Sequence, residues 1–226
     1  MSLITPHPHP HPQAHLLAHR VAQAQRLLPL VAILRGLQPA EAIDVGNALA
    51  EAGFHLIEVP LNSPDPFNSI EQLRRHLPPE VLVGAGTVLQ PEQLARLVDV
   101  GADLAVMPHA DLALIREAKA AGLLCVPGVA TPTEAFAALS AGADALKLFP
   151  AELISPAAVK AMRAVLPAEV ALLPVGGITP ERMADYRRAG ANGFGLGSAL
   201  YAPGRSAVEV GALAQAFATA WRATGG

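Results

Sequence analysis

The sequence predicts an α/β protein whose eight strand–helix units close into a (β/α)8 TIM barrel, with an extra helix at the amino end. Eight short apolar runs recur along the chain, each followed by a turn and a segment with helical periodicity. Strands that alternate with helices form parallel sheets, and eight near-equal units favour closure into a barrel. No linker or change of composition interrupts residues 13–226, so we expect one domain.

The chain opens with a tail, residues 1–12, in which His and Pro alternate from His7 to Pro12. Alternating proline disfavours helix, so we expect this tail to be disordered. Residues 13–28 carry Leu and Val among Ala and Gln and predict the extra leading helix. The eight strands are then expected at 30–34, 55–60, 81–84, 104–107, 123–127, 145–149, 171–175 and 193–196.

The helices between these strands carry start and stop signals. Proline is favoured at the first helical position, and glycine just past the last turn. A final helix at about 206–223 would close the ring. The start signals are Pro39, Pro91, Thr131-Pro132, Ser155-Pro156 and Thr179-Pro180, and the stop signals are Gly53, Gly101, Gly122, Gly142 and Gly190.

Composition excludes several classes of protein. Hydrophobic residues make up 52% of the 226 residues and charged residues only 15%, which suits a large core with apolar surface left for a subunit interface. The net charge of −3 without a basic stripe argues against a nucleic-acid partner, and no apolar run approaches the roughly 20 residues of a membrane helix. The chain has a single cysteine, Cys125, and we expect it to be a thiol buried in the core.

No secretory signal is evident in the sequence, so we expect a cytoplasmic location.

Two titratable residues, Glu58 and Lys147, interrupt apolar strands near the carboxyl ends, where such barrels place their active sites. Lysine is scarce in this chain, and arginine could not replace an amine that must become neutral, because its pKa stays above about 12. One interpretation is a structural ion pair across the barrel. The other is a nucleophilic Lys147 beside a proton-shuttling Glu58, with desolvation and Arg35 keeping the amine neutral. The strand pattern alone leaves both open.

Glycine-rich segments follow the last two strands, Val175-Gly176-Gly177 and Gly195-Leu196-Gly197-Ser198, and each precedes a helix. Backbone N–H groups at such positions bind anions, and this corner of the barrel often holds phosphate. We therefore expect a phosphorylated small molecule, with tight turns alone as the alternative. The sequence has no metal-ligand spacing such as HExxH or paired cysteines, so we expect no metal and no cofactor.

Four motifs resemble the KDPG/KHG aldolase family over about residues 27–222: Leu30–Gly36, Ile57–Pro64, Val83–Leu89 and Ala145–Pro150. The resemblance implies a class I, pyruvate-dependent aldolase on a (β/α)8 barrel, and a homotrimer. It implies that Lys147 forms the imine and that Glu58 is the acid and base. It further implies pyruvate-binding roles for Arg35, Thr87 and Phe149, and places the substrate phosphate at Gly176, Gly177, Gly197 and Ser198.

Two positions favour one substrate within the family. Asn62 stands where the gluconate enzymes usually have arginine, and Val175 where they usually have threonine. The resemblance therefore implies cleavage of 2-dehydro-3-deoxy-6-phosphogalactonate to pyruvate and D-glyceraldehyde 3-phosphate, because a hydroxyl gained or lost near C4 can select between C4 epimers. The alternatives are the gluconate epimer as main substrate, a non-catalytic sugar-phosphate sensor, or another phosphate-binding barrel enzyme such as an isomerase.

Overall fold

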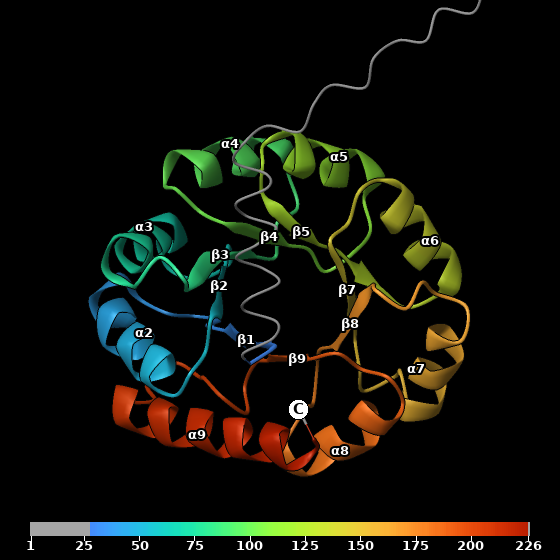
Figure 1. Ribbon diagram of the computed structural model, residues 1–226. Helices are drawn as coiled ribbons and strands as arrows, with labels where there is room; N and C mark the ends of the chain where they lie inside the picture. Colours follow the sequence, from blue (N-terminus) through green and yellow to red (C-terminus); the bar gives the residue numbers. More distant parts are fainter. Residues whose placement is uncertain (1–27, 226) are drawn as a thin grey trace, which may run out of the picture.

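A computed structural model describes residues 28–225 of the chain. The predicted tail, residues 1–12, and the predicted leading helix, residues 13–28, lie outside this range apart from Leu28. All strand pairs are parallel and the helices lie outside them, as Figure 1 shows. The predicted α/β class with a parallel sheet is therefore confirmed.

The strands form two sheets, with the orders β5-β4-β3-β2-β1-β9 and β6-β7-β8. Backbone hydrogen bonds join the sheets at both seams: Asn192 N–H donates to Leu172 O at 2.9 Å, and Asp144 N–H donates to Cys125 O at 3.0 Å. The strands are β1 (Leu30–Ile33), β2 (Leu56–Pro60), β3 (Leu82–Gly86), β4 (Leu104–Val106), β5 (Leu124–Val126), β6 (Gly128–Val129), β7 (Ala145–Leu148), β8 (Ala171–Pro174) and β9 (Phe194–Leu196).

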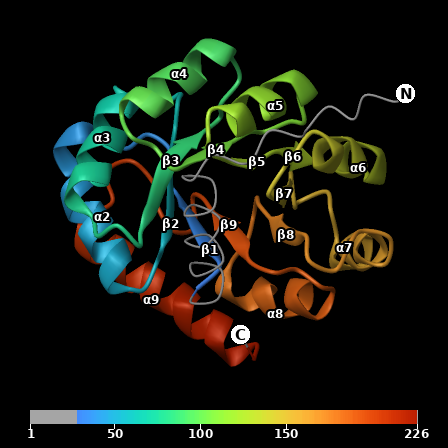
Figure 2. The same ribbon diagram turned by 45° about the horizontal axis from the view of Figure 1, so that its top comes forward.

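Helices surround the strands in both views of the molecule (Figures 1 and 2). Proline occupies the first turn of η1, α4, α6, α7 and α8, at the five predicted start signals, and also that of α3, which was not predicted. The helical elements are η1 (Pro39–Glu41), α2 (Ala42–Glu51), α3 (Pro66–His76), α4 (Pro91–Asp99), α5 (Leu112–Ala120), α6 (Pro132–Ser140), α7 (Pro156–Arg163), α8 (Pro180–Arg188) and α9 (Ala207–Ala223). Within residues 28–225, no helix combines the length and apolar character needed to cross a bilayer.

Apolar side chains pack in two places, because successive residues of a strand point to opposite faces. The larger cluster lies between strands and helices and includes Ile57, Val59 and Leu146. Cys125 is also buried there, and desolvation raises the pKa of its thiol to about 12. The smaller cluster comprises Leu56, Leu82, Leu104, Val106, Leu124, Val126, Ala145, Ala171 and Leu173. Glu58 and Lys147 follow Leu56 and Ala145 by two residues, so they point to the same face as this smaller cluster.

A repeated polar contact holds the amino ends of neighbouring strands together. Gly-Ala-Asp occurs at 101–103 and 142–144, and Gly-Ala-Asn at 190–192. The third residue of each motif makes two hydrogen bonds to one residue of the adjacent strand. Its side chain accepts from the backbone N–H of that strand residue, and its backbone N–H donates to the carbonyl of the same strand residue. The pairs are Asp103 with Val83, Asp144 with Cys125, and Asn192 with Leu172, at 2.7–3.0 Å.

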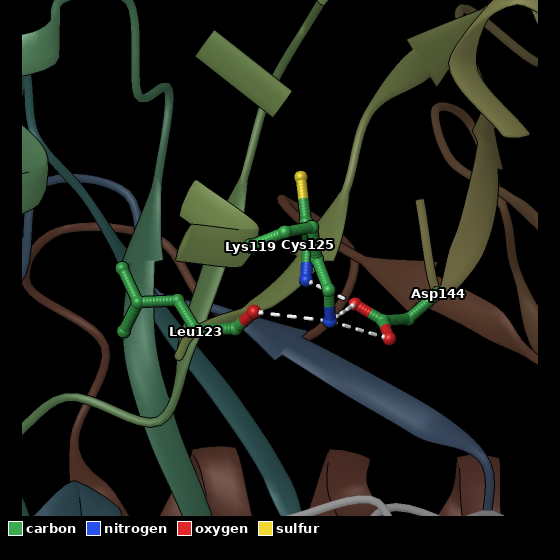
Figure 3. Close-up of polar contacts among 4 residues, drawn as sticks. All are labelled: Lys119, Leu123, Cys125 and Asp144. Carbon is green, nitrogen blue, oxygen red and sulfur yellow. Dashed lines mark hydrogen bonds and ion pairs between the residues drawn. The ribbon is translucent and has the colours of Figure 1, made fainter. Parts of the chain in front are cut away.

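The Asp144 contact is shown in Figure 3. Lys119 Nζ donates to both carboxylate oxygens of Asp144 at 2.7 Å and to the Leu123 carbonyl at 3.4 Å. Cys125 N–H donates to the same carboxylate at 2.8 Å. Arg74 pairs with Asp103 in the same way, at 3.2 Å. These contacts leave the opposite, carboxyl ends of the strands free for a site.

Replacing Asp144 by Ala is expected to lower the free energy of unfolding by about 1–3 kcal/mol, because the buried Cys125 N–H loses its acceptor. Asp144→Asn should recover most of this loss, since Asn192 fills the same role in the third contact. The measurement is urea unfolding followed by circular dichroism. The matched control is Asp185→Ala, which removes an exposed pair with Arg188 and should change stability by less than about 0.5 kcal/mol. Equal losses in the two alanine variants would contradict the proposed role.

Candidate active site

Glu58 on β2 and Lys147 on β7 are buried, with 1% and 5% of their surfaces exposed. Strand register places Glu58 beside Ile33 and Gly84, and Lys147 beside Gly128 and Leu173. Both residues also border the same small void of about 30 Å³, whose other lining residues are apolar apart from one glycine. A void of this size holds about one water molecule. The structure therefore brings together the two titratable groups that the sequence placed on separate strands.

Desolvation dominates the electrostatics of this pair. Burial lowers the pKa of Lys147, and the Arg35 charge lowers it further, while the Glu58 charge raises it. Burial raises the pKa of Glu58, against the opposing effects of Lys147 and Arg35. Each group is thus shifted toward its neutral form, the amine and the carboxylic acid. These are the forms needed for a nucleophile and for a general acid.

The pair does not form a direct ion pair. Among residues 28–225, Glu58 Oε2 has no hydrogen-bond partner and no salt bridge joins this carboxylate to Lys147. A buried polar atom left unpaired costs about 1–3 kcal/mol, so its presence calls for an explanation. This geometry favours a functional pair over the structural ion pair that the sequence left open.

The end of β3 is shaped around Glu58. A methyl group at position 86 would lie 2.5 Å from Glu58 Oε1, so any side chain there would displace the carboxylate from this position. The next residue, Thr87, is half-buried and has a φ of 56°. A left-handed backbone is rare for a β-branched residue, and such strain concentrates at functional sites. Thr87 therefore adjoins the residue that accommodates Glu58.

A cavity of about 510 Å³ lies above the carboxyl ends of β1, β7, β8 and β9. It shares Ile33, Lys147 and Val175 with the smaller void, so Lys147 lies where the two meet. Glu58 borders only the small void, and Thr87 borders neither. The larger cavity is lined by Ile33, Arg35, Lys147, Phe149, Glu152, Val175, Gly176, Gly177, Ile178, Thr179, Gly197, Ser198, Ala199, Tyr201, Ala202 and Pro203. The other predicted site residues are all among them.

Phe149 and Arg35 lie close to the amine at this end of the cavity. Lys147 Nζ is 4.8 Å from the centroid of the Phe149 ring, which favours the charged amine by a cation–π contact. Arg35 is exposed, and its Nη1 donates to Asn62 Oδ1 at 2.6 Å. An exposed cation beside a buried amine provides an attractive position for a carboxylate.

The glycine-rich segments form the other end. Gly176 and Gly177 have φ angles of 114° and 58°, which favour glycine. Arg182 donates to the Gly177 carbonyl, and Arg205 Nη1 donates to the Ser198 carbonyl at 3.1 Å. Two arginines therefore bond the two loops without lining the cavity, and their positive charges favour an anion near these loops.

Two polar residues of this cavity wall, Glu152 and Tyr201, were not predicted, and neither was Arg182, which bonds the Gly177 carbonyl without lining the cavity. A methyl group at Gly176 would lie 2.1 Å from Glu152 Oε2, so the Glu152 carboxylate rests against the glycine pair. Tyr201 OH donates to Glu41 Oε1 at 2.6 Å and packs the wall from the last βα loop. Arg182 contacts the loop from α8. The available signal for Glu152 was its proximity to Phe149-Pro150, and for Tyr201 its proximity to Gly197-Ser198, whereas nothing in the sequence indicated Arg182. No cluster of three or more His, Cys, Asp or Glu within the described range could bind a metal ion.

The pKa shift of Lys147 predicts its chemical reactivity. The rate of its acetylation should reach half its maximum at a lower pH than for free Nα-acetyl-lysine, because the neutral amine is the reactive form. Glu58→Gln should lower this midpoint further, and Arg35→Gln should raise it, since the two charges act in opposite directions. Peptide mass spectrometry after short pulses at each pH measures the rate. Shifts of the same sign in both variants would contradict this account.

Comparison with known proteins identifies related chains. A protein of Rhizobium meliloti (strain 1021), named a probable 2-dehydro-3-deoxy-6-phosphogalactonate aldolase, is 53% identical over 182 residues, covering 80% of this chain and 86% of that protein. The 2-dehydro-3-deoxy-6-phosphogalactonate aldolase of Escherichia coli (strain K12) is 46% identical over 200 residues, covering 88% and 98%.

A solved structure described as native KDPGal superposes with a TM-score of 0.86 at 46% identity, covering 87% of this chain and 96% of that one. The sequence model of the KDPG and KHG aldolases matches residues 21–216, which include every residue of the predicted site. The chain therefore belongs to the KDPG and KHG aldolase family.

Proposed function

We propose that this protein is a class I aldolase, a carbon–carbon lyase that cleaves 2-dehydro-3-deoxy-6-phosphogalactonate to pyruvate and D-glyceraldehyde 3-phosphate. The observation that carries the proposal is Lys147, a buried amine with a lowered pKa at the floor of a cavity of about 510 Å³. The relatives named for this reaction, at 53% and 46% identity, support the same substrate.

The chemistry follows from the two buried groups. The neutral amine of Lys147 attacks the C2 ketone, and the carbinolamine loses water to give an iminium ion, with Glu58 as the proton donor. The iminium accepts the electron pair of the C3–C4 bond while Glu58 takes the proton of the C4 hydroxyl. This releases the aldehyde and leaves an enamine. Protonation at C3 and hydrolysis then free pyruvate and the amine.

The two ends of the cavity suit the two ends of this substrate. Arg35 would hold the pyruvate carboxylate, and Phe149 would pack beside the imine. Thr87 borders neither cavity, so its proposed contact with the carboxylate rests on the family resemblance alone. At the far end, the backbone of Gly176 and Gly177 and the segment Gly197-Ser198 would bind the phosphate. No step of this mechanism calls for a metal ion or a cofactor, and the absence of both stays a prediction.

We also infer that the two sheets form one (β/α)8 barrel. Pro127, which has no N–H to donate, separates β5 from β6, so these two segments count as a single strand. The hydrogen bonds at both seams, with a further parallel bridge between Val175 and Gly195, support closure.

We propose a homotrimer on the strength of the family resemblance and of apolar side chains on the surface. Leu153 and Val208 are 82% and 83% exposed, and Phe136 is 46% exposed, which suits burial against other subunits. The cytoplasmic location expected from the sequence stays a prediction.

Borohydride reduction in the presence of pyruvate is expected to attach pyruvate irreversibly to Lys147, because reduction converts the imine to a stable secondary amine. Lys147→Ala should abolish the adduct, and Lys147→Arg should also abolish it while retaining a positive charge. Mass spectrometry of the intact protein and its peptides identifies the modified residue. Pyruvate bound without an adduct would favour a sugar-phosphate sensor or another phosphate-binding enzyme, and an adduct on another lysine would overturn the assignment.

Val175 is expected to select the epimer. It is 7% exposed and borders both cavities beside Lys147. Val175→Thr adds a hydroxyl of nearly the same volume, and should shift the ratio of kcat/KM for the galactonate and gluconate epimers by about tenfold toward gluconate. The measurement couples pyruvate release to lactate dehydrogenase. Equal kcat/KM values for the two epimers in the unsubstituted protein would refute the proposed substrate preference.

A further inference from the structure

The loop after β1 is held by the turn after β2. Gly36 N–H donates to Ser63 Oγ at 2.9 Å, and Ser63 is only 8% exposed. A methyl group at Gly36 would lie 2.6 Å from Pro203 Cγ, so the backbone also passes close to Pro203. The backbone that carries Arg35 is thus held by one hydrogen bond and one close packing contact.

The Arg35 side chain, in contrast, is exposed and long. Fixing such a side chain in one rotamer costs up to about 2 kcal/mol of conformational entropy. Within residues 28–225, its one hydrogen bond runs from Nη1 to Asn62 Oδ1, at 2.6 Å. Asn62 therefore supplies the restraint that the backbone contacts do not supply.

We propose that Asn62 is a positioning residue for the proposed aldol reaction: its amide oxygen holds one guanidinium nitrogen of Arg35 and leaves the others directed at the carboxylate of the pyruvate moiety. This inference rests on the proposed function, because it takes Arg35 as the carboxylate ligand. Asn62 thereby acts at the carboxylate end of the site, away from the glycine-rich phosphate end.

The chemistry of the side chain explains why an amide suits this position. An asparagine oxygen accepts a hydrogen bond from arginine without neutralising its charge. An aspartate at the same position would also bond Arg35, but as a salt bridge whose negative charge would oppose the substrate carboxylate. Alanine would remove the restraint and leave the positive charge in place. The two substitutions therefore separate loss of orientation from loss of charge.

Exchange of the pyruvate methyl protons in D2O, followed by NMR, tests this inference, because exchange requires pyruvate binding and enamine formation but no second substrate. Asn62→Ala should raise KM for pyruvate about tenfold, with a smaller change in kcat, since the lost bond involves a charged group. Asn62→Asp should raise KM further. The matched control is Asn68→Ala. Asn68 lies on α3 and its exposed amide donates to Asp65, so its removal should leave KM unchanged.

A double-mutant cycle separates positioning from a general structural effect. In an Arg35→Ala background, Asn62→Ala should have no further effect on KM, because Asn62 acts through Arg35. Equal effects of Asn62→Ala with and without Arg35, or an unchanged KM in the single variant, would overturn the inference. In either case, normal borohydride trapping of pyruvate on Lys147 would leave the proposed aldolase function intact, whereas loss of trapping in the unsubstituted protein would refute that function itself.

Discussion

The structure depends on one constraint, the burial of a lysine amine among parallel apolar strands. Leu56, Leu104 and Leu173 belong to the apolar cluster that lies on the face of Lys147, and this face has little polar surface to solvate a charge. The cost of desolvation moves Lys147 toward its neutral form and Glu58 toward its protonated form. The same apolar packing that stabilises the fold therefore prepares the reactive groups.

The amino ends of the strands contribute to stability, whereas the carboxyl ends form the candidate site. At the amino ends, Asp103, Asp144 and Asn192 connect neighbouring strands through reciprocal hydrogen bonds, two of them reinforced by a basic side chain from a helix. At the carboxyl ends, glycines and an unpaired carboxylate oxygen replace such contacts. Strain at Thr87 and the unpaired Glu58 Oε2 are tolerated there because stability comes from the remainder of the strands.

Much of this arrangement was predictable from local patterns. Proline at helix starts, glycine at helix ends and apolar runs between them located the elements, because each signal acts within a few residues. The rule that sites lie at carboxyl strand ends then selected Glu58 and Lys147. Glu152 and Tyr201 were missed, although each lies three residues after a predicted site residue, because the direction of a loop side chain depends on tertiary packing and not on a local pattern. The sequence pointed to Asn62 only as a position that selects the epimer; its contact with Arg35 was hidden, since the two residues are 27 positions apart.

The sequence by itself determined the α/β class, the strand positions and the identity of the family, because periodicity and motifs are properties of short segments. Only the tertiary structure decided whether Glu58 and Lys147 form an ion pair. Distance and solvation are set by packing between strands that are far apart in the chain, and that packing leaves the two groups unbonded and desolvated. The same packing placed Asn62 beside Arg35, a contact between two loops that no local pattern encodes.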